Sequence, residues 1–276
     1  MTKNIWEIAI GLNKVDNLKP SSFLRELIDK KLSCDEMEKE ILKYYGFRYL
    51  TSKIERDLRE CDLVSIRTVK LLENKEFKFS IDYLKKIHKS LFSDILKKNY
   101  VGIFRNYNIS KNERILSGNS VIYADYRELT ECLNYDFERE KKNDYKNLSL
   151  DEKIKKISNF ISSIWQVHPF IEGNTRTTAL FLIKYLKKLG FKLNEDIFIK
   201  NSLYFRNTLV ISNFSDITLG ISPDFKYLRS FFSKLLLNKT QELIDLKEFK
   251  EKINFKENNN SWTKKLANDK SNDFER

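Results

Sequence analysis

Apolar residues recur every three or four positions along most of the 276-residue chain, which is the spacing of one face of an α-helix. The clearest stripe runs through residues 81–96, with isoleucine or leucine at Ile81, Leu84, Ile87, Leu91 and Ile95. A less regular pattern predicts another helix in residues 52–74. Seven glycines and three prolines are few beside the roughly 7% and 5% of average proteins, so helix breakers are scarce. The chain is therefore predicted to be mainly α-helical.

The first 50 residues have amphipathic stretches of their own and are predicted to form a small helical domain. After Pro20, one helical stripe holds Phe23, Leu24, Leu27 and Ile28. The next stretch begins with Asp35 and Glu36, in keeping with the preference of a helix N-terminus for negative charge. Gly46 is expected to end that helix.

The helical spacing is interrupted between residues 100 and 124. There the polar run Ser117–Ser120 separates the segment Arg114–Leu116 from the segment Val121–Tyr123. A polar, glycine-containing turn between two short apolar segments predicts a β-hairpin, which would form a flap on the surface of the helical domain.

Two strong helical patterns follow one another in the second half of the chain. Ser149 and Glu152 have the spacing of a capping box and predict the start of an amphipathic helix. His168 falls at the C-terminal end of this helix. The second pattern, residues 175–189, is apolar nearly all round and stops at Gly190, so it is predicted to be the buried centre of the fold.

The last part of the chain turns polar. From residue 239 onward apolar residues are few, and this composition predicts a polar tail without a packed core. The sequence is thus divided into a helical segment at 1–50, a main domain at 51–238 and a polar C-terminal tail at 239–276.

Three widely spaced cysteines, Cys34, Cys61 and Cys132, fit neither a disulfide framework nor a zinc site. The N-terminus lacks the apolar core of a signal peptide, and no apolar run approaches the roughly 20 residues of a membrane span. These features predict a reduced cytoplasmic protein without a membrane partner.

The formal net charge of +12 at pH 7 would suit a nucleic-acid partner or a lysine-rich surface. Lysines are spread over the whole chain, and many have acidic neighbours, as in Glu38-Lys39-Glu40. No basic run is interleaved with aromatic residues as a base-stacking surface requires. A lysine-rich surface is therefore favoured, and no nucleic-acid partner is expected.

The turn between the two strong helices carries the candidate chemistry. Gly173 and Asn174 immediately precede the buried helix, whose free backbone N–H groups favour an anion. Arg176 adds a guanidinium suited to phosphate oxygens. Glu172 beside an anion is unfavourable unless a cation such as Mg²⁺ lies between them. His168 has a side chain whose pKa suits proton abstraction from a hydroxyl.

Each of these residues has a simpler structural interpretation when it is taken alone. His168 would cap a helix, Glu172 would be an exposed carboxylate, and Arg176 would lie on the surface. Gly173 and Asn174 would form an ordinary turn between helices. Together, in nine residues that lead into a buried helix, they supply a base, a metal ligand and a phosphate site.

The segment His168-Pro169-Phe170-Ile171-Glu172-Gly173-Asn174-Thr175-Arg176 resembles the Fic signature, HPFx(D/E)GN(G/K)R with another arginine three positions further on. Residues 84–92 and 102–105 are similar to the helix and loop that precede the Fic flap. The resemblance covers residues 68–238 and implies a Fic-fold helical bundle with a short β-hairpin flap and a small N-terminal helical domain.

The resemblance also implies roles for individual residues. His168 would be the base, Glu172 would bind Mg²⁺, Gly173 and Asn174 would bind the α- and β-phosphates of ATP, and Arg176 would bind the β-phosphate. Phe170 would anchor the loop in the core, and His88 would be structural. The flap would hold a target peptide by strand addition, with the residues Leu116, Gly118, Val121 and Tyr123.

Two positions depart from the signature. Thr175 replaces the glycine that usually follows the motif asparagine, and Ala179 stands where the second arginine is expected. In the family that arginine contacts the γ-phosphate and pairs with an inhibitory glutamate. Its absence leaves the nucleotide donor open.

The segment Leu12–Pro20 is similar to the inhibitory helix of Fic antitoxin domains, (S/T)xxxE(G/N), with Asp16 for the glutamate and Asn17 in the last position. Alternatively, Asp16 and Asn17 merely end a helix. With a shorter acid and no second arginine, the usual salt bridge is not expected, and inhibition would rest on steric obstruction.

The resemblance implies a toxin–antitoxin type of protein adenylyltransferase, which would transfer AMP from ATP to a Ser, Thr or Tyr hydroxyl of a target protein with Mg²⁺ and would be inhibited in cis. Two alternatives remain. One is a Fic-fold transferase of another phosphate-linked group, and the other is a non-catalytic helical protein that binds nucleic acid.

Overall fold

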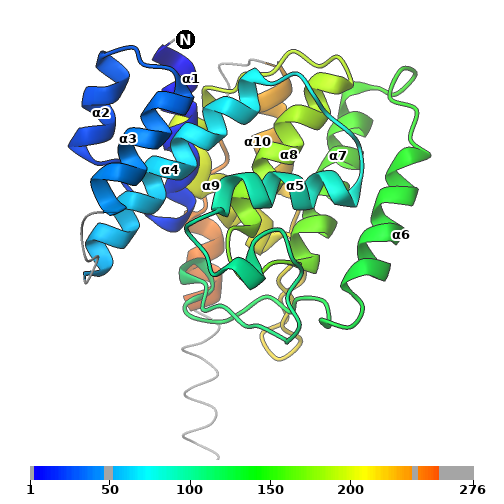
Figure 1. Ribbon diagram of the computed structural model, residues 1–276. Coiled ribbons are helices and arrows are strands. Elements are labelled where there is room, and N and C mark those ends of the chain that lie inside the picture. Colours follow the sequence, from blue (N-terminus) through cyan, green and yellow to red (C-terminus); the bar gives the residue numbers. More distant parts are fainter. Residues whose placement is uncertain (1–2, 47–51, 238–241, 255–276) are drawn as a thin grey trace, which may run out of the picture.

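The computed structural model describes residues 3–46, 52–237 and 242–254, and the regular elements in these ranges are helices (Figure 1). They are α1 (Lys3–Leu12), η1 (Asn13–Asp16), α2 (Ser22–Asp29), α3 (Cys34–Gly46), α4 (Lys53–Glu73), α5 (Ile81–Phe92), η2 (Lys98–Tyr100), η3 (Arg114–Leu116), α6 (Leu129–Lys141), α7 (Leu150–Val167), α8 (Asn174–Lys188), α9 (Ile197–Ile211) and α10 (Lys226–Leu237). The predicted mainly helical fold is thus confirmed.

Helices α1–α4 pack together on one side of the molecule (Figure 1). They share an apolar core of their own: Trp6, Ala9, Leu24, Leu27, Cys34, Met37, Ile41, Tyr45, Leu63, Ile66 and Val69. Asp62 of α4 also accepts hydrogen bonds from the Ser21 hydroxyl at 2.6 Å and the Tyr45 hydroxyl at 3.0 Å. The packing of the N-terminal helices therefore extends past residue 50 into α4, although the division of the chain at that residue stays a prediction.

The main core surrounds α8, in which residues 174–186 are all buried. Helices α5 and α7 pack against α8, and the α7 capping box predicted at Ser149 and Glu152 is present. Helix α1 reaches this part of the molecule through its contact with α9. A Cβ at Gly11 would lie 2.5 Å from the Phe198 carbonyl oxygen, so only glycine permits this close approach. The contact places η1, with Asp16, beside α8 and α9.

The predicted β-hairpin flap is wrong. Residues 111–125 contain the 3₁₀ turn η3 and no strand. Within this loop the Glu113 N–H donates a hydrogen bond to the Asn119 carbonyl, and the Glu113 carbonyl accepts one from the Gly118 N–H, both at 3.0 Å. Val121 and Tyr123 are buried while Ile122 is 77% exposed, so the alternation typical of a strand is real. Among the residues that the structure describes, the segment has no neighbouring strand with which to pair.

The predicted polar tail at 239–276 is partly wrong. Residues 247–254 are helical, and Leu246, Phe249 and Ile253 are buried against the main core. A few apolar residues at helical spacing suffice for this packing, which the overall polar composition concealed. Residues 255–276 lie outside the described ranges.

Within the described residues, no helix combines the length and the apolar character that crossing a membrane requires.

Candidate active site

A six-residue turn, residues 168–173, joins α7 to α8 and is held by its backbone conformation at both ends. His168 ends α7 in the left-handed region (φ 48°), and Gly173 precedes α8 with φ 75°. A Cβ at Gly173 would lie 2.3 Å from the ring of Phe92, so both the conformation and the space require glycine. The first N–H groups of α8 lack intrahelical acceptors and point into this turn.

The side chain of Asn174 fixes the turn from within. Its Oδ1 accepts a hydrogen bond from the Phe170 N–H at 2.9 Å, and its Nδ2 donates to the Phe170 carbonyl at 2.7 Å. Phe170 is buried and stacks on His88, which confirms its predicted anchoring role. The Asn174 side chain thus shapes the turn, and the backbone N–H groups remain for an anion.

His168 is a buried, neutral imidazole. Burial, and then the positive charge of Lys111, hold the pKa of His168 well below its ordinary value of 6.5. Its Nδ1 lies 3.1 Å from the Trp165 carbonyl oxygen, which only accepts hydrogen bonds, so Nδ1 carries the proton. Nε2 is left unprotonated, as a general base requires. The ring stacks on Tyr123 with centroids 4.0 Å apart.

Arg105 holds the backbone of the turn at its first residue. Its Nε donates to the His168 carbonyl at 2.9 Å, and its backbone N–H donates to the Pro169 carbonyl at 2.8 Å. The guanidinium also contacts the Val167 and Ala124 carbonyls. One arginine therefore fixes the position of His168 relative to the loop that carries Tyr123.

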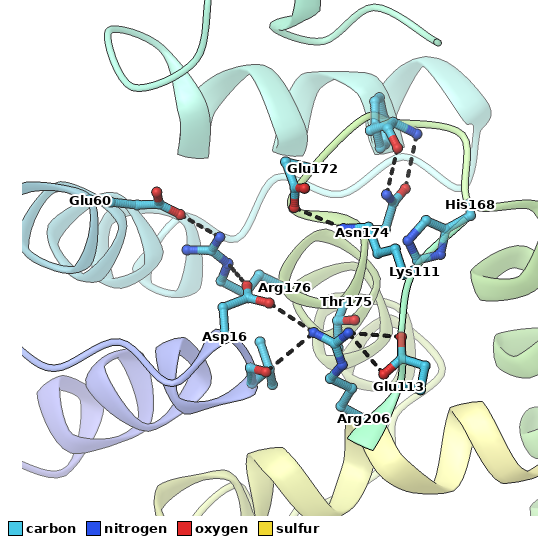
Figure 2. A network of polar contacts seen from close by, with 12 residues as sticks. Asp16, Glu60, Lys111, Glu113, His168, Glu172, Asn174, Thr175, Arg176 and Arg206 are labelled. Carbon is cyan, nitrogen blue, oxygen red and sulfur yellow. Dashed lines mark hydrogen bonds and ion pairs between the residues drawn. The ribbon is translucent and has the colours of Figure 1, made fainter. Parts of the chain in front are cut away.

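Glu172, the predicted metal ligand, is half exposed and has a cation against it. Lys111 Nζ lies 2.9 Å from Glu172 Oε2 (Figure 2). The backbone of Glu172 is held by His88, whose Nδ1 accepts from the Gly102 N–H and whose Nε2 donates to the Glu172 carbonyl. Burial lowers the pKa of His88 to about 4, in keeping with the structural role expected for it.

Arg176, the predicted phosphate ligand, is only 4% exposed and is surrounded by acceptors of the protein (Figure 2). Its Nη2 lies 2.6 Å from Glu60 Oε1, and its Nη1 donates to Asn13 Oδ1 at 3.1 Å. Its Nε lies 2.9 Å from Asp16 Oδ2 as an ion pair without the alignment of a hydrogen bond. The ring of Phe92 lies against the guanidinium.

Asp16 makes a second ion pair, with Arg206 of α9. Arg206 Nη1 lies 3.0 Å from Asp16 Oδ1, and Arg206 Nη2 lies 2.9 Å from Glu113 Oε1. The usual salt bridge to position 179 is absent, as expected, because that position is Ala179. Asp16 pairs instead with Arg176 and with Arg206, two partners that the sequence analysis did not foresee.

The structure thus brings together the predicted residues His168, Glu172, Gly173, Asn174, Arg176 and Asp16. Asn17 ends η1 in the left-handed conformation, and no side-chain contact to the turn is seen for it. Of the predicted flap residues, Leu116, Val121 and Tyr123 are buried and Gly118 has φ 99°, and their role in docking a target stays a prediction. Thr175, which replaces a glycine, accepts a hydrogen bond from Trp165 Nε1 at 3.0 Å.

Sequence reasoning missed the residues Glu60, Lys111, Glu113 and Arg206. No local pattern marks them, since they come from α4, from the loop that precedes η3 and from α9, all distant in sequence from the turn. The one available signal was that Arg176, if buried, needs carboxylate partners. This requirement does not identify which acidic residues of the chain those partners are.

Comparison with known proteins agrees with this geometry. The family model described as "Fic/DOC family" matches residues 78–186. Protein adenylyltransferase VbhT of Bartonella schoenbuchensis is 26% identical over 119 residues, which are 43% of this chain and 23% of VbhT. The match therefore spans less than a quarter of that protein.

Two solved structures share the fold. The N-terminal Fic domain of a Bartonella effector protein from Bartonella sp. AR 15-3 has a TM-score of 0.51 and 18% identity, over 69% of this chain and 91% of that one. A Fic-domain-containing signalling protein from Bacteroides thetaiotaomicron has a TM-score of 0.50 and 15% identity, over 91% and 97%. The part of the chain that matches the Fic/DOC family model, residues 78–186, contains the turn at His168–Arg176, and the two solved structures show that the chain shares their fold.

Proposed function

We propose that the protein transfers AMP from ATP to a Ser, Thr or Tyr hydroxyl of a target protein, and that Asp16 restrains this activity in cis. The observation that carries the proposal is the neutral His168, with an unprotonated Nε2, at the edge of the anion-binding N-terminus of α8. The similarity to an adenylyltransferase, VbhT, supports the choice of reaction.

In the proposed reaction the target hydroxyl attacks the α-phosphorus of ATP. The new O–P bond forms as the bond between the α-phosphorus and the bridging oxygen breaks, and pyrophosphate leaves. The hydroxyl proton passes to Nε2 of His168. The N–H groups at Gly173 and Asn174 hold the α- and β-phosphates, so the chain contributes positioning and charge stabilisation.

The residues present fit a Mg²⁺ ion that is shared with a nucleotide. Among the described residues there is no cluster of three or more acidic, histidine or cysteine ligands. Mg²⁺ commonly uses one or two carboxylates, with phosphate oxygens and water completing its shell. Glu172 would supply that carboxylate, which is half exposed and pairs with the ammonium group of Lys111 in this structure. The ion would neutralise phosphate charge beside Glu172.

The inhibition in cis is proposed from the partners of Arg176. Its guanidinium is taken up by Asp16, Glu60 and Asn13, so a phosphate that uses Arg176 must displace at least one of them. Deleting residues 1–50 would strip α4 of its apolar partners and expose Leu63 and Ile66. A single substitution at Asp16 is therefore the sharper way to release the site.

A target protein would approach beside the loop that carries Tyr123. A groove of about 700 Å³ runs between this loop and helices α6 and α7, and Tyr123 and Val167, which flank His168, line it. Glu128 and Glu131 also line the groove and are exposed. The negative charge favours a target segment with basic residues near its hydroxyl.

A second candidate is the transfer of another phosphate-linked group. The observation that favours it is the complete burial of Ala179 in α8, so position 179 gives no contact to the end of a triphosphate. The position of the label separates the two candidates, because only AMP transfer carries the α-phosphorus of ATP to the target.

The test uses ATP radiolabelled at either the α- or the γ-phosphorus, with Mg²⁺ and bacterial lysate. We expect Asp16→Asn protein to label a target from α-labelled ATP, and the double variant Asp16→Asn/His168→Ala to label nothing. If the target is labelled by γ-labelled ATP but not by α-labelled ATP, the reaction is phosphate transfer and not AMP transfer. Label that persists without His168 would contradict the assignment of the base.

A further inference from the structure

One face of the His168 ring is covered by an aromatic side chain that comes from a distant loop. Tyr123 stacks on the imidazole with ring centroids 4.0 Å apart and an angle of 24° between the ring planes. The indole of Trp165 lies against the same imidazole at 88°, with centroids 5.1 Å apart. His168 is 3% exposed and Tyr123 is 9% exposed, so both rings are enclosed by the protein. The plane of the imidazole is therefore set by two aromatic neighbours as well as by the hydrogen bond at Nδ1.

The backbone on both sides of Tyr123 is tied to the C-terminal end of α7. Gln166 Nε2 donates to the carbonyl of the residue before Tyr123 at 3.2 Å, and Nη2 of Arg105 donates to the carbonyl of the residue after it. The same guanidinium donates through Nε to the His168 carbonyl at 2.9 Å. Because the chain is held relative to α7 both before and after Tyr123, the stacked pair of rings is a fixed part of the site.

The ring of Tyr123, and not its hydroxyl, makes the contact with the imidazole. The hydroxyl oxygen is buried and has no hydrogen-bond partner among the residues that the structure describes, although the Glu113 carboxylate is near it. A buried hydroxyl without a partner lowers the stability of a fold, so the hydroxyl gives no structural reason for a tyrosine at this position. What the side chain supplies here is a planar aromatic face for His168.

We propose that Tyr123 is a positioning residue of the reaction, whose ring holds the imidazole of His168 in the orientation in which Nε2 accepts the proton of the target hydroxyl. The inference rests on the proposed function for the identity of that hydroxyl. Proton transfer requires the two heavy atoms within hydrogen-bond distance, and a displacement of about 1 Å can cost about a hundredfold in rate. The hydrogen bond at Nδ1 alone leaves the imidazole free to tilt about that bond, and the stacked ring removes this freedom.

The stacked ring also keeps water away from the imidazole. Burial, and then the positive charge of Lys111, lower the pKa of His168 most. The cations Arg206 and Arg105 lower it further, and the hydrogen bond to the Trp165 carbonyl raises it. Loss of the ring admits water and leaves these charges in place, so the pKa should rise part of the way toward its ordinary value of 6.5. A variant without the ring should therefore lose its base to protonation at a higher pH than the unchanged protein does.

The first test needs no reaction, because the chain contains two histidines, His88 and His168. Diethyl pyrocarbonate modifies accessible neutral imidazoles, and peptide mapping by mass spectrometry distinguishes the two sites. We expect Tyr123→Leu, which fills the space without an aromatic face, to raise the modification rate of His168 several-fold and to leave that of the buried His88 unchanged. Tyr123→Phe keeps the ring and should react like the unchanged protein. Tyr123→Met covers the case that the leucine variant does not fold.

The second test measures target labelling from α-labelled ATP over a series of bacterial lysate concentrations, with every variant made in Asp16→Asn protein. We expect Tyr123→Leu to lower the rate at saturating lysate about tenfold or more, and to make that rate fall as the pH drops through 6.5. The lysate concentration for half-saturation should not rise. Tyr123→Phe should retain both the rate and its pH dependence. Tyr135→Leu is the matched control, because Tyr135 lines the same groove as Tyr123 and is 66% exposed; it should keep the saturating rate.

An unchanged rate of His168 modification in folded Tyr123→Leu protein would overturn the inference, whether or not AMP transfer is observed. A Tyr123→Leu protein that only needs more lysate for half-saturation would also overturn it, because Tyr123 would then be a wall of the groove. A Tyr123→Phe protein as slow as Tyr123→Leu would do the same, since the effect would belong to the hydroxyl. If no variant labels a target but His168 becomes reactive in Tyr123→Leu alone, the positioning of His168 by Tyr123 stands and the proposed reaction is wrong.

Discussion

Asp16→Asn is the substitution for which the structure makes the sharpest prediction. The amide has the shape of the carboxylate but lacks its charge, and it weakens two ion pairs at 2.9 and 3.0 Å while Glu60 still compensates Arg176. A contact to a charged group contributes about 1.5–3 kcal/mol, and the amide oxygen retains part of it. The free energy of unfolding should therefore fall by about 1–2 kcal/mol.

The same substitution should strengthen nucleotide binding, because the phosphate no longer competes with a carboxylate for Arg176. A competing interaction of about 1.4 kcal/mol corresponds to a tenfold change in the dissociation constant. Urea unfolding followed by circular dichroism gives the stability, and calorimetry with ATP and Mg²⁺ gives the affinity. Lower stability together with tighter ATP binding is the signature of a carboxylate that occupies a ligand site.

Asp35→Asn serves as the matched control for this experiment. Asp35 pairs with Lys70 on the exposed side of the N-terminal bundle and touches neither Arg176 nor Arg206. Its removal should leave ATP affinity unchanged. The reasoning is refuted if Asp16→Asn lowers the stability and the ATP affinity together, or if it changes neither.

Three further predictions concern the turn itself. Gly173→Ala should lower the unfolding free energy by about 1–3 kcal/mol in urea titrations and abolish ATP binding, because φ is 75° and Cβ would meet Phe92. The pKa values of His168 and His88 are lower in the folded protein than in the unfolded chain, and that of His88 is about 4. As the pH falls below 6.5, the unfolded chain therefore takes up protons at these histidines first, and the stabilisation of the folded state that is present above pH 6.5 is lost. The free energy of unfolding should fall as the pH drops from 6.5 toward 4, by up to about 1.4 kcal/mol per pH unit for each histidine. The rate of target labelling, which needs neutral His168, should stay constant as the pH drops below 6.5. Glu172→Gln should remove the Mg²⁺ dependence of ATP affinity, measured by calorimetry with and without EDTA; a dependence that persists would exclude Glu172 as the ligand.

The helices and the turn could be predicted from the sequence because their signals are local. The capping box at Ser149 and Glu152, the apolar stripe of α7 and the glycine before α8 lie within a few residues of the structures they specify. The position of His168 at the end of α7 followed from the same pattern. The spacing of residues was sufficient to predict a structural feature wherever that feature depends on a single helix or a single turn.

The partners of Asp16 could not be predicted, since they depend on how distant segments pack. Arg176 is 160 positions from Asp16 along the chain, and Arg206 is 190. They meet because Gly11 lets α1 approach α9, which no periodicity reveals. The β-hairpin was wrongly predicted for a related reason. The alternation of buried and exposed side chains around Ile122 is a local property, whereas a strand needs a neighbouring strand with which to pair.

The central claim is that His168 takes the proton of a target hydroxyl while AMP passes from ATP to that hydroxyl. Mass spectrometry of the protein labelled by Asp16→Asn, with mapping of the modified peptide, tests it most directly. We expect one AMP moiety on a Ser, Thr or Tyr side chain, and no such adduct with Asp16→Asn/His168→Ala protein. An adduct of another mass, or an AMP adduct that forms equally well without His168, would contradict it.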